Sequence, residues 1–329
     1  MKIPQKPIRI LLINIILLLL VLIIGEIVCR VAGIPYKVTW EPDQNAFGQF
    51  DPELGWSYIP NKSTMSKTGS ISKPVHFDVN GIRVPHTDFQ FDGSKPSILF
   101  IGGSITMGHG LTYEESFVGK FDAFEEAPYQ VVNLAVQGYG SDQALLALKK
   151  YLPKFNTKVV VYTFFNHHLR RNGNYDRRQL TPSAKFLGTK PLLSLNSENK
   201  LYLAKKPSLY KDYDYSHSWL FDLYRMRIGS KLGTFPPLPE DLTKAIIQEM
   251  KKISNESDAH FLILDWKWTD DDEIRFLQDL DVDIIDTLDE APSGWDEMVI
   301  QRGVHPTAEA SDHAARLLID FFNSKNLLE

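Results

Sequence analysis

Short, continuous apolar runs that alternate with helical segments constrain the fold of this chain most strongly. Runs of this length without polar alternation are typical of strands that are buried on both faces of a sheet. We expect five strands, at Ser97–Ile101, Tyr129–Leu134, Lys158–Phe165, His260–Asp265 and Val282–Asp286. We expect helices at Tyr113–Phe124, Asp142–Tyr151 and Thr307–Phe322, with others between the later strands. The alternation predicts an α/β fold, a three-layer α/β/α sandwich with a mainly parallel sheet of about five strands.

The chain divides into three parts of different composition. Residues 1–34 read as a membrane anchor, residues 35–95 as an irregular spacer that packs on the domain, and residues 96–329 as the main domain. The spacer is rich in Pro, Gly, Asp, Asn and aromatic residues and lacks sustained periodicity. Within the domain, residues 170–239 interrupt the alternation with a segment dense in Tyr, Trp, Lys and Arg. This insertion is either a lid or substrate wall, or an ordinary insertion packed over the domain.

The N-terminal apolar run has the length and flanks of a membrane-spanning helix. Lys2, Lys6 and Arg9 precede the run Ile10–Ile24, which continues to Val28. About 20 apolar residues span a bilayer as a helix, and positive charge before the run keeps the N-terminus in the cytoplasm. We therefore expect an uncleaved anchor with the rest of the chain exported. The alternative is a cleaved signal peptide with its small-residue site at residues 31–33.

Composition excludes several classes of function. The formal net charge is −5 and no Lys/Arg-rich tract is present, so nucleic acid is not an expected partner. Cys29 is the single cysteine, which rules out an intramolecular disulfide and a cysteine zinc site. His167 and His168 are adjacent and project in different directions, so they do not form a metal site by themselves. No metal and no cofactor are expected.

A glycine-rich turn directly after the first strand carries the main chemical signal. The segment Gly102–Gly108 places Ser104 where a strand turns sharply into a helix, and this presents the hydroxyl beyond the sheet edge. Backbone N–H groups at such a turn help to stabilise a developing oxyanion. A phosphate-binding loop is the rival interpretation, but the segment lacks the Lys-Ser/Thr ending of a P-loop and the G-x-G-x-x-G of a dinucleotide site.

Three later segments complete a pattern that resembles the SGNH (GDSL-type) hydrolase family. The second is Asn133–Gly138 after the second strand, the third contains Asn166 after the third strand, and the last is His305-Pro306 before the final helix. The match covers roughly residues 96–322. It implies the family's α/β fold, with Ser104 as nucleophile and His305 as base. It also implies an oxyanion site made by the N–H groups of Ser104 and Gly138 and the side-chain amide of Asn166.

The sequence departs from the family pattern most seriously at Arg302. The family carries an acid there, three residues before the histidine, and an acid beside the base fixes its tautomer. Three accounts stay open. First, another carboxylate can replace this acid; Asp296 and Glu297 are nearest in sequence, and Asp286 and Asp289 lie further back. Second, a backbone carbonyl can orient the imidazole, which leaves a Ser–His dyad. Third, the site is catalytically degenerate. Gly103 also replaces the family's Asp, and the third segment lacks the usual Gly and Asp.

The expected function is that of a serine esterase or acyl hydrolase that forms an acyl-serine intermediate. O-acyl groups on envelope or extracellular glycans are the expected substrate class, so the partner is an ester-bearing small molecule or polysaccharide. The anchor and the segments at residues 50–56 and 79–83 resemble exported bacterial members, which implies a single-pass inner-membrane protein with a periplasmic domain. The alternatives are an O-acyltransferase with the same site and a catalytically degenerate module that binds glycan or lipid. The sequence does not indicate an oligomeric state.

Overall fold

The computed structural model describes residues 5–36, 48–68, 71–124, 129–180, 187–214, 216–235, 237–268, 275–299 and 305–327. The strands are β1 Gly48–Asp51, β2 Gly55–Tyr58, β3 Ser63–Thr68, β4 Ile71–Phe77, β5 Arg83–Val84, β6 Pro96–Ile101, β7 Gln130–Asn133, β8 Asn156–Phe164, β9 Leu192–Leu195, β10 Leu201–Lys205, β11 His260–Asp265 and β12 Asp283–Asp286. The helices are α1 Gln5–Ala32, α2 Ser104–Met107, α3 Phe117–Phe124, α4 Ser141–Tyr151, α5 His167–Asn172, α6 Trp219–Tyr224, α7 Glu240–Asn255, α8 Arg275–Gln278, α9 Trp295–Val299 and α10 Ala308–Lys325. Shorter helical turns are η1 Leu152–Lys154, η2 Arg177–Gln179, η3 Tyr210–Asp212 and η4 Arg225–Gly229.

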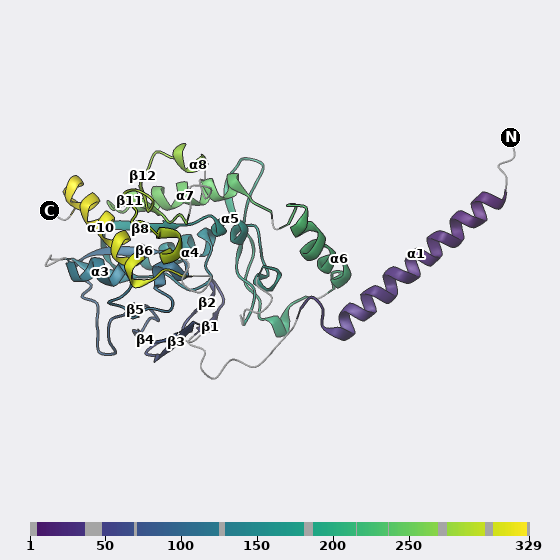
Figure 1. Ribbon diagram of the computed structural model, residues 1–329, viewed down its shortest axis with the longest axis horizontal. Coiled ribbons are helices and arrows are strands. Elements are labelled where there is room, and N and C mark those ends of the chain that lie inside the picture. The colour runs from purple at the N-terminus through teal and green to yellow at the C-terminus, as the bar shows by residue number, and fades with distance from the viewer. Residues whose placement is uncertain are drawn as a thin grey trace.

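An eight-stranded sheet in the order β12-β11-β8-β6-β7-β5-β4-β3 forms the centre of the molecule (Figure 1). Its first five strands are parallel to one another. They coincide closely with the five strands predicted from the apolar runs, and β11 has the predicted bounds. Central strands β6 and β8 are almost entirely buried, which explains why their sequences are apolar without alternation.

Helices cover both faces of this sheet, which confirms the predicted three-layer α/β/α sandwich. On one face, α3 and α10 pack through an apolar cluster that includes Phe121, Leu318 and Phe322. On the other face, α4 and α7 pack through a cluster that includes Leu148 and Ile247. Since every parallel strand runs in the same direction, the loops after β6, β7 and β8 meet at one edge of the sheet.

The segment before the domain is more regular than expected. Residues 35–95 were predicted to be an irregular spacer, but β3, β4 and β5 add three antiparallel strands to the sheet next to β7. A separate hairpin, β1-β2, precedes them. The prediction of irregular structure is wrong here because β3 is the edge strand and β4 lies next to it, with polar residues such as Ser and Lys where the parallel strands have apolar runs. Residues 37–47 and 69–70 of this segment lie outside the described residues.

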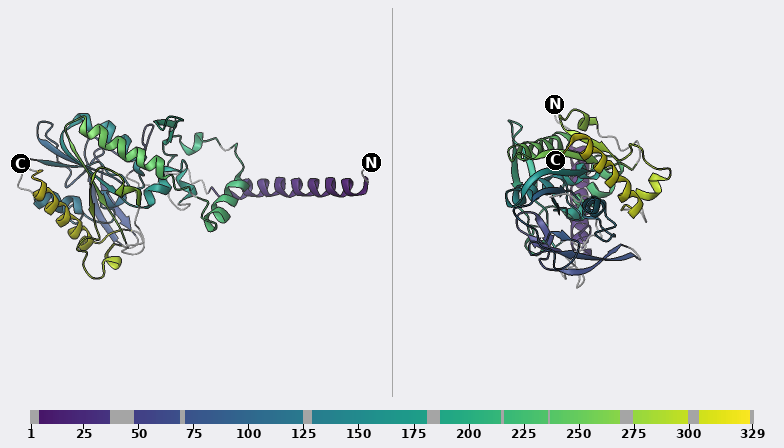
Figure 2. Two further views of the ribbon diagram at one scale, coloured as in Figure 1. Left: turned by 90° about the horizontal axis from the view of Figure 1, so that it is seen from above. Right: turned by 90° about the vertical axis from the view of Figure 1, so that its left-hand side faces the viewer.

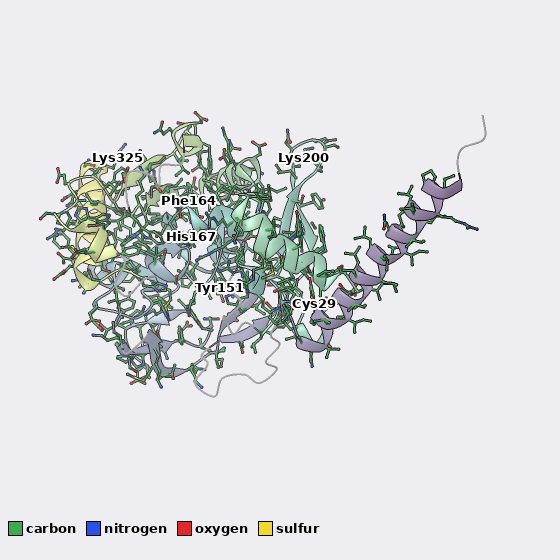
Figure 3. All side chains as sticks on the ribbon, turned by 45° about the vertical axis from the view of Figure 1, so that its right-hand side comes forward. Cys29, Tyr151, Phe164, His167, Lys200 and Lys325 are labelled. Carbon is green, nitrogen blue, oxygen red and sulfur yellow. The ribbon has the colours of Figure 1, made fainter. Side chains whose placement is uncertain are left out.

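Helix α1 stands out from the body as a long, straight projection (Figure 2). Residues Pro7–Ala32 form one helix that is long and apolar enough to cross a membrane. At its C-terminal end α1 contacts α6, where the Glu26 carboxylate accepts hydrogen bonds from the backbone N–H groups of Trp219 (3.1 Å) and Leu220 (3.0 Å). Cys29 packs there against Tyr36 and Trp219, at the foot of α1 (Figure 3).

The insertion at residues 170–239 folds into its own small elements beside the sheet edge. It contains the antiparallel pair β9-β10 and, further along the chain, α6 and η4. In Figure 1 these elements lie between the sheet and α1. The insertion therefore occupies the side of the molecule onto which the loops after the parallel strands open.

Candidate active site

Ser104 lies in a tight turn between β6 and α2, as the glycine-rich segment predicts. The residue is the first of α2 and is 6% exposed. Gly102 permits the turn because it has a φ of 151°, and a Cβ there would lie 2.4 Å from Thr106 Oγ1 and 3.1 Å from the Thr163 carbonyl oxygen. A side chain at residue 102 would therefore disrupt the backbone beside Ser104.

The loops after β7 and β8 lie against this turn. The Val136 N–H donates to the Gly102 carbonyl (3.3 Å), which holds the loop containing Gly138 beside the nucleophile turn. Gly138 has a φ of 84°, a conformation that favours glycine. Within the described part of the chain, neither the Ser104 N–H nor the Gly138 N–H donates a hydrogen bond. Both are suitable donors to an oxyanion.

Asn166 follows β8 and precedes α5. It occupies the N-cap position of α5, but its side chain makes no capping hydrogen bond to that helix. Because β8 and β7 flank β6 in the sheet, Ser104, Gly138 and Asn166 stand at the carboxyl ends of three neighbouring strands. This is the arrangement expected of a nucleophile with oxyanion donors on either side.

His305 approaches the same edge from the start of α10, and His109 connects it to the nucleophile turn. The His109 N–H donates to the Ser104 carbonyl (3.0 Å), and the ring centroids of His109 and His305 are 4.7 Å apart. The Ser66 hydroxyl oxygen lies 3.2 Å from Nδ1 of His109, and this hydrogen bond holds the His109 ring in place. Ser104 and His305 are both described residues, and no hydrogen bond joins the Ser104 hydroxyl to the His305 ring. Such bonds are often long before substrate binds.

Burial keeps the His305 imidazole neutral. Desolvation is the largest of the effects that together lower the pKa of His305 to about 3, and the electrostatic effects of His109 and Arg171 act in the same direction. Desolvation likewise lowers the pKa of His109 to about 4. A neutral imidazole is the form that accepts a proton, so His305 is available as a base throughout the neutral pH range.

The acid that the family pattern requires is not found among the described residues. His305 Nδ1 is buried and has no hydrogen-bond partner in the described ranges. Of the four carboxylates considered, Asp286 is paired with Lys267, and Asp289, Asp296 and Glu297 are exposed. None of them forms an ion pair with His305. Residues 301–304, including Arg302, lie outside the described residues.

Two further side chains at the site were not predicted. A Cβ at Gly103 would lie 3.1 Å from Arg171 Nη1 and 3.3 Å from His168 Nε2, so both groups border the backbone next to Ser104. Arg171 Nη1 also donates to the Tyr139 carbonyl (2.7 Å), and His168 Nδ1 lies 2.8 Å from the Tyr162 hydroxyl. Only the basic and polar character of residues 167–171 hinted at this in the sequence, because their place beside Gly103 depends on α5 folding back over the turn.

Gly103 replaces the Asp of the family pattern at a closely packed position. A Cβ there would require Arg171 and His168 to shift by a few tenths of an ångström. In the described ranges, no group of three His, Cys, Asp or Glu residues is arranged to hold a metal ion.

Comparisons with known proteins give structural neighbours only. No family model matches the chain, and no curated protein matches it. The chain is similar to the solved structure of TesA, with 16% identity, 70% of this chain and 99% of that chain covered, and a TM-score of 0.41. It is also similar to a lipolytic G-D-S-L family protein from Veillonella parvula, with 11% identity, 69% and 98% coverage, and a TM-score of 0.40.

The psychrotrophic esterase EstA from Pseudoalteromonas sp. is a further neighbour, with 14% identity, 71% and 99% coverage, and a TM-score of 0.39. GDSL-type lipolytic proteins and esterases are thus among the solved structures that this chain resembles. Because these identities and TM-scores are low, the function is inferred below from the site's own geometry.

Proposed function

We propose that this chain is a serine hydrolase of the SGNH type that cleaves ester bonds through an acyl-Ser104 intermediate. The observation that carries the proposal is the convergence of Ser104, Gly138 and Asn166 at the ends of three adjacent parallel strands, with the neutral His305 ring joined to the turn through His109. A serine, two unused backbone N–H groups and a neutral imidazole are the components that acyl transfer requires.

In the proposed reaction, His305 removes the proton from the Ser104 hydroxyl as its oxygen attacks the ester carbonyl carbon. The N–H groups of Ser104 and Gly138 and the Asn166 amide stabilise the oxyanion that forms; loss of one such donor typically costs about 2.7–4 kcal/mol. His305 then protonates the leaving alcohol as the ester C–O bond breaks. Water attacks the acyl-serine, its proton passes through His305, and the free acid and Ser104 hydroxyl are regenerated.

The missing acid favours a Ser–His dyad over a triad in this proposal. The described carboxylates near the end of the chain are exposed or paired elsewhere, whereas the His305 ring is positioned by its packing on His109. Contact with a second ring restricts the orientation of the imidazole, a task that the acid performs in triads. We propose that His109 is a positioning residue for His305.

We further propose that α1 anchors the protein in a bacterial inner membrane with the domain in the periplasm. The support is the apolar span Pro7–Ala32 and the basic residues around its start. In that location, O-acyl groups on envelope or extracellular glycans are the proposed substrates. Transfer of the acyl group to a sugar hydroxyl uses the same intermediate, and it differs only in excluding water from the second step.

The test is hydrolysis of p-nitrophenyl acetate by the full-length protein in detergent micelles, compared with Ser104→Ala and His305→Ala. We expect each substitution to lower kcat/KM by at least about a thousandfold, because each removes a group that takes part in bond making or proton transfer. Ser324→Ala and His86→Ala are matched controls at exposed positions and should leave the rate unchanged.

A rate that survives Ser104→Ala would overturn the serine mechanism. If the unaltered protein releases no nitrophenol even with a sugar acceptor present, the catalytically degenerate module that binds glycan or lipid becomes the better interpretation.

A further inference from the structure

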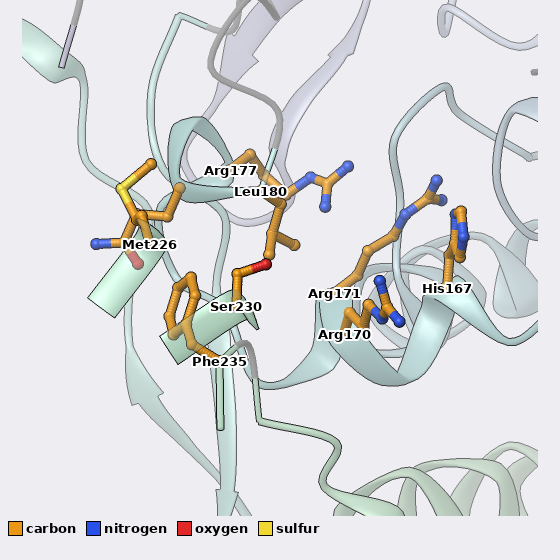
Figure 4. A pocket seen from close by; sticks show the side chains of 9 residues that line it. His167, Arg170, Arg171, Arg177, Leu180, Met226, Ser230 and Phe235 are labelled. Carbon is orange, nitrogen blue, oxygen red and sulfur yellow. The ribbon is translucent and has the colours of Figure 1, made fainter. Parts of the chain in front are cut away.

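A cavity of about 240 Å³ lies next to the nucleophile turn, between α5 and the insertion (Figure 4). Its lining residues are His167, Arg170, Arg171, Arg177, Gln179, Leu180, Met226, Ser230 and Phe235. In Figure 4 the guanidinium groups and the His167 ring lie on one side of the cavity, and Met226 and Phe235 lie on the other. Small-ligand pockets commonly measure about 300–1,000 Å³, so this cavity suits one small group rather than an extended ligand.

The lining is strongly cationic. Three arginines contribute to it and no Asp or Glu residue does. Arg177 is 5% exposed, and desolvation lowers the pKa of its guanidinium to about 10. Desolvation also lowers the pKa of Arg171, and the charge of Arg177 lowers it further. Like charges held together in a partly buried place are costly unless an anion is bound among them.

The carboxylates near this cluster are shared with other cations. Asp142 forms a fully buried ion pair with Lys190, and its charge also acts on Arg171 and Arg177. Asp176 forms an ion pair of 2.6 Å with Arg178, the neighbour of Arg177 that is not part of the lining. The Arg171 guanidinium donates to the Tyr139 carbonyl. Because the lining contains three arginines and no Asp or Glu residue, positive charge is in excess at the cavity.

Arg171 connects this cavity to the chemistry. Its Nη1 atom lies 3.1 Å from the position of a Cβ on Gly103, and its charge acts on the His305 ring. An anionic group held by Arg171 would therefore lie close to the backbone next to Ser104.

We propose that the pocket of Arg170, Arg171 and Arg177 is a subsite for an anionic oxygen group of the substrate, a carboxylate or a phosphate. Arginine suits this role because its planar fork donates two parallel hydrogen bonds to such groups. The proposal rests on the proposed ester chemistry and narrows it: the natural substrate is an acylated molecule that also carries negative charge, such as an acidic sugar unit. The apolar side chains opposite would contact the uncharged face of that unit.

The test measures binding separately from turnover. Full-length Ser104→Ala protein in detergent is titrated calorimetrically with glucuronate, with inorganic phosphate and with neutral glucose. We expect binding of at least one anion, weakened as salt is raised, and much weaker binding of glucose. Glucuronate and phosphate distinguish a sugar carboxylate from a phosphate group. Equal binding of glucose and both anions, or no binding of either anion, would overturn the proposal.

Variants then assign the binding to the pocket. Arg177→Gln in the Ser104→Ala background should weaken anion binding by about tenfold or more, because a charged hydrogen-bond donor is lost. Arg316→Gln, an exposed arginine on α10, is the matched control and should have no effect. Should the buried Arg177 variant fold poorly, Arg170→Gln at the exposed rim supplies a second measurement, with a smaller expected loss.

Unchanged binding in folded Arg177→Gln and Arg170→Gln proteins would also contradict the subsite. Failure of the esterase proposal would instead appear as nitrophenol release that Ser104→Ala does not reduce, whatever the titrations show.

Discussion

The depressed pKa of His305 determines how the proposed reaction should respond to acid. A histidine with the ordinary pKa of about 6.5 is only about 3% neutral near pH 5, and a rate that needs the neutral base falls accordingly. With the pKa of His305 lowered to about 3, the ring stays neutral there. We expect kcat/KM for p-nitrophenyl acetate to change less than about threefold between pH 7 and pH 5.

Stability has to be followed in the same experiment, because burial of neutral histidines makes folding pH-dependent. The folded-state pKa values of His109 and His305 lie below the unfolded value, so the unfolded state binds more protons as the pH falls. Their contribution to stability is complete above about pH 6.5 and declines below it. Circular dichroism at each pH separates unfolding from loss of the base. A rate that falls tenfold per pH unit from about 6.5, in folded protein, would contradict the low pKa.

The positions of Ser104, Gly138 and Asn166 after three strands were predictable from the sequence, because apolar runs locate the strands and parallel strands end at one edge. Their catalytic roles stay predictions. His109 was missed because it belongs to no motif and becomes relevant only through ring contact with His305. The arginine cluster was missed because Arg177 comes from the insertion, whose fold carries no periodic signal.

At the scale of elements, the antiparallel extension β3–β5 supports the nucleophile turn. Arg83 on β5 is 1% exposed and donates to the carbonyls of Met107, Gly108 (2.9 Å) and Leu111 (2.8 Å) in the loop after α2. A Cβ on Gly108 would lie 2.6 Å from Arg83 Nη1, so only glycine admits this approach. The extension was not predicted, because its strands lack the apolar runs that identified the parallel strands.

Arg83→Met tests this support. We expect a loss of about 3 kcal/mol in the free energy of unfolding, because three buried carbonyls lose a charged donor. The urea midpoint of the full-length protein in detergent measures it, with Arg316→Met as the exposed control. kcat should fall more than KM rises, since the displaced loop follows α2, whose first residue is Ser104, and does not line the cavity described above. A change in stability below about 0.5 kcal/mol would mean that the loop holds its shape without Arg83.

At the scale of the whole molecule, α1 and the domain are joined by a specific contact. The Glu26 carboxylate accepts from the Ser218 hydroxyl (2.8 Å) as well as from two N–H groups at the start of α6, and Arg30 donates to the His217 carbonyl (2.9 Å). A carboxylate at a helix start satisfies amides that have no partner inside the helix. Sequence patterns located α1 but gave no sign that its last turns bind the insertion.

Glu26→Ala should loosen this contact. We expect the amides of Trp219 and Leu220 to exchange hydrogen about five- to tenfold faster, since an N-terminal cap is worth about 1 kcal/mol. Hydrogen exchange followed by mass spectrometry, on full-length protein in nanodiscs, measures this. Glu26→Gln, which keeps one acceptor oxygen, should have a smaller effect, and exchange in α10 should not change. Equal exchange in α6 for all three proteins would show that the contact does not hold the helix.

With α1 in a bilayer as proposed, the contact between α1 and α6 also determines where the proposed reaction can take place. A helix of 26 residues is about 39 Å long, whereas the hydrocarbon core is about 30 Å thick, so the last turns of α1 emerge to meet α6. The hydrogen bonds of Glu26 and Arg30 then restrict the motion of the domain relative to α1. The candidate active site therefore stays at a nearly constant height above the bilayer and moves only in parallel with the membrane, by lateral diffusion. Under the proposed function, an acyl group on a glycan strand is accessible only as that stretch of polymer passes at that height.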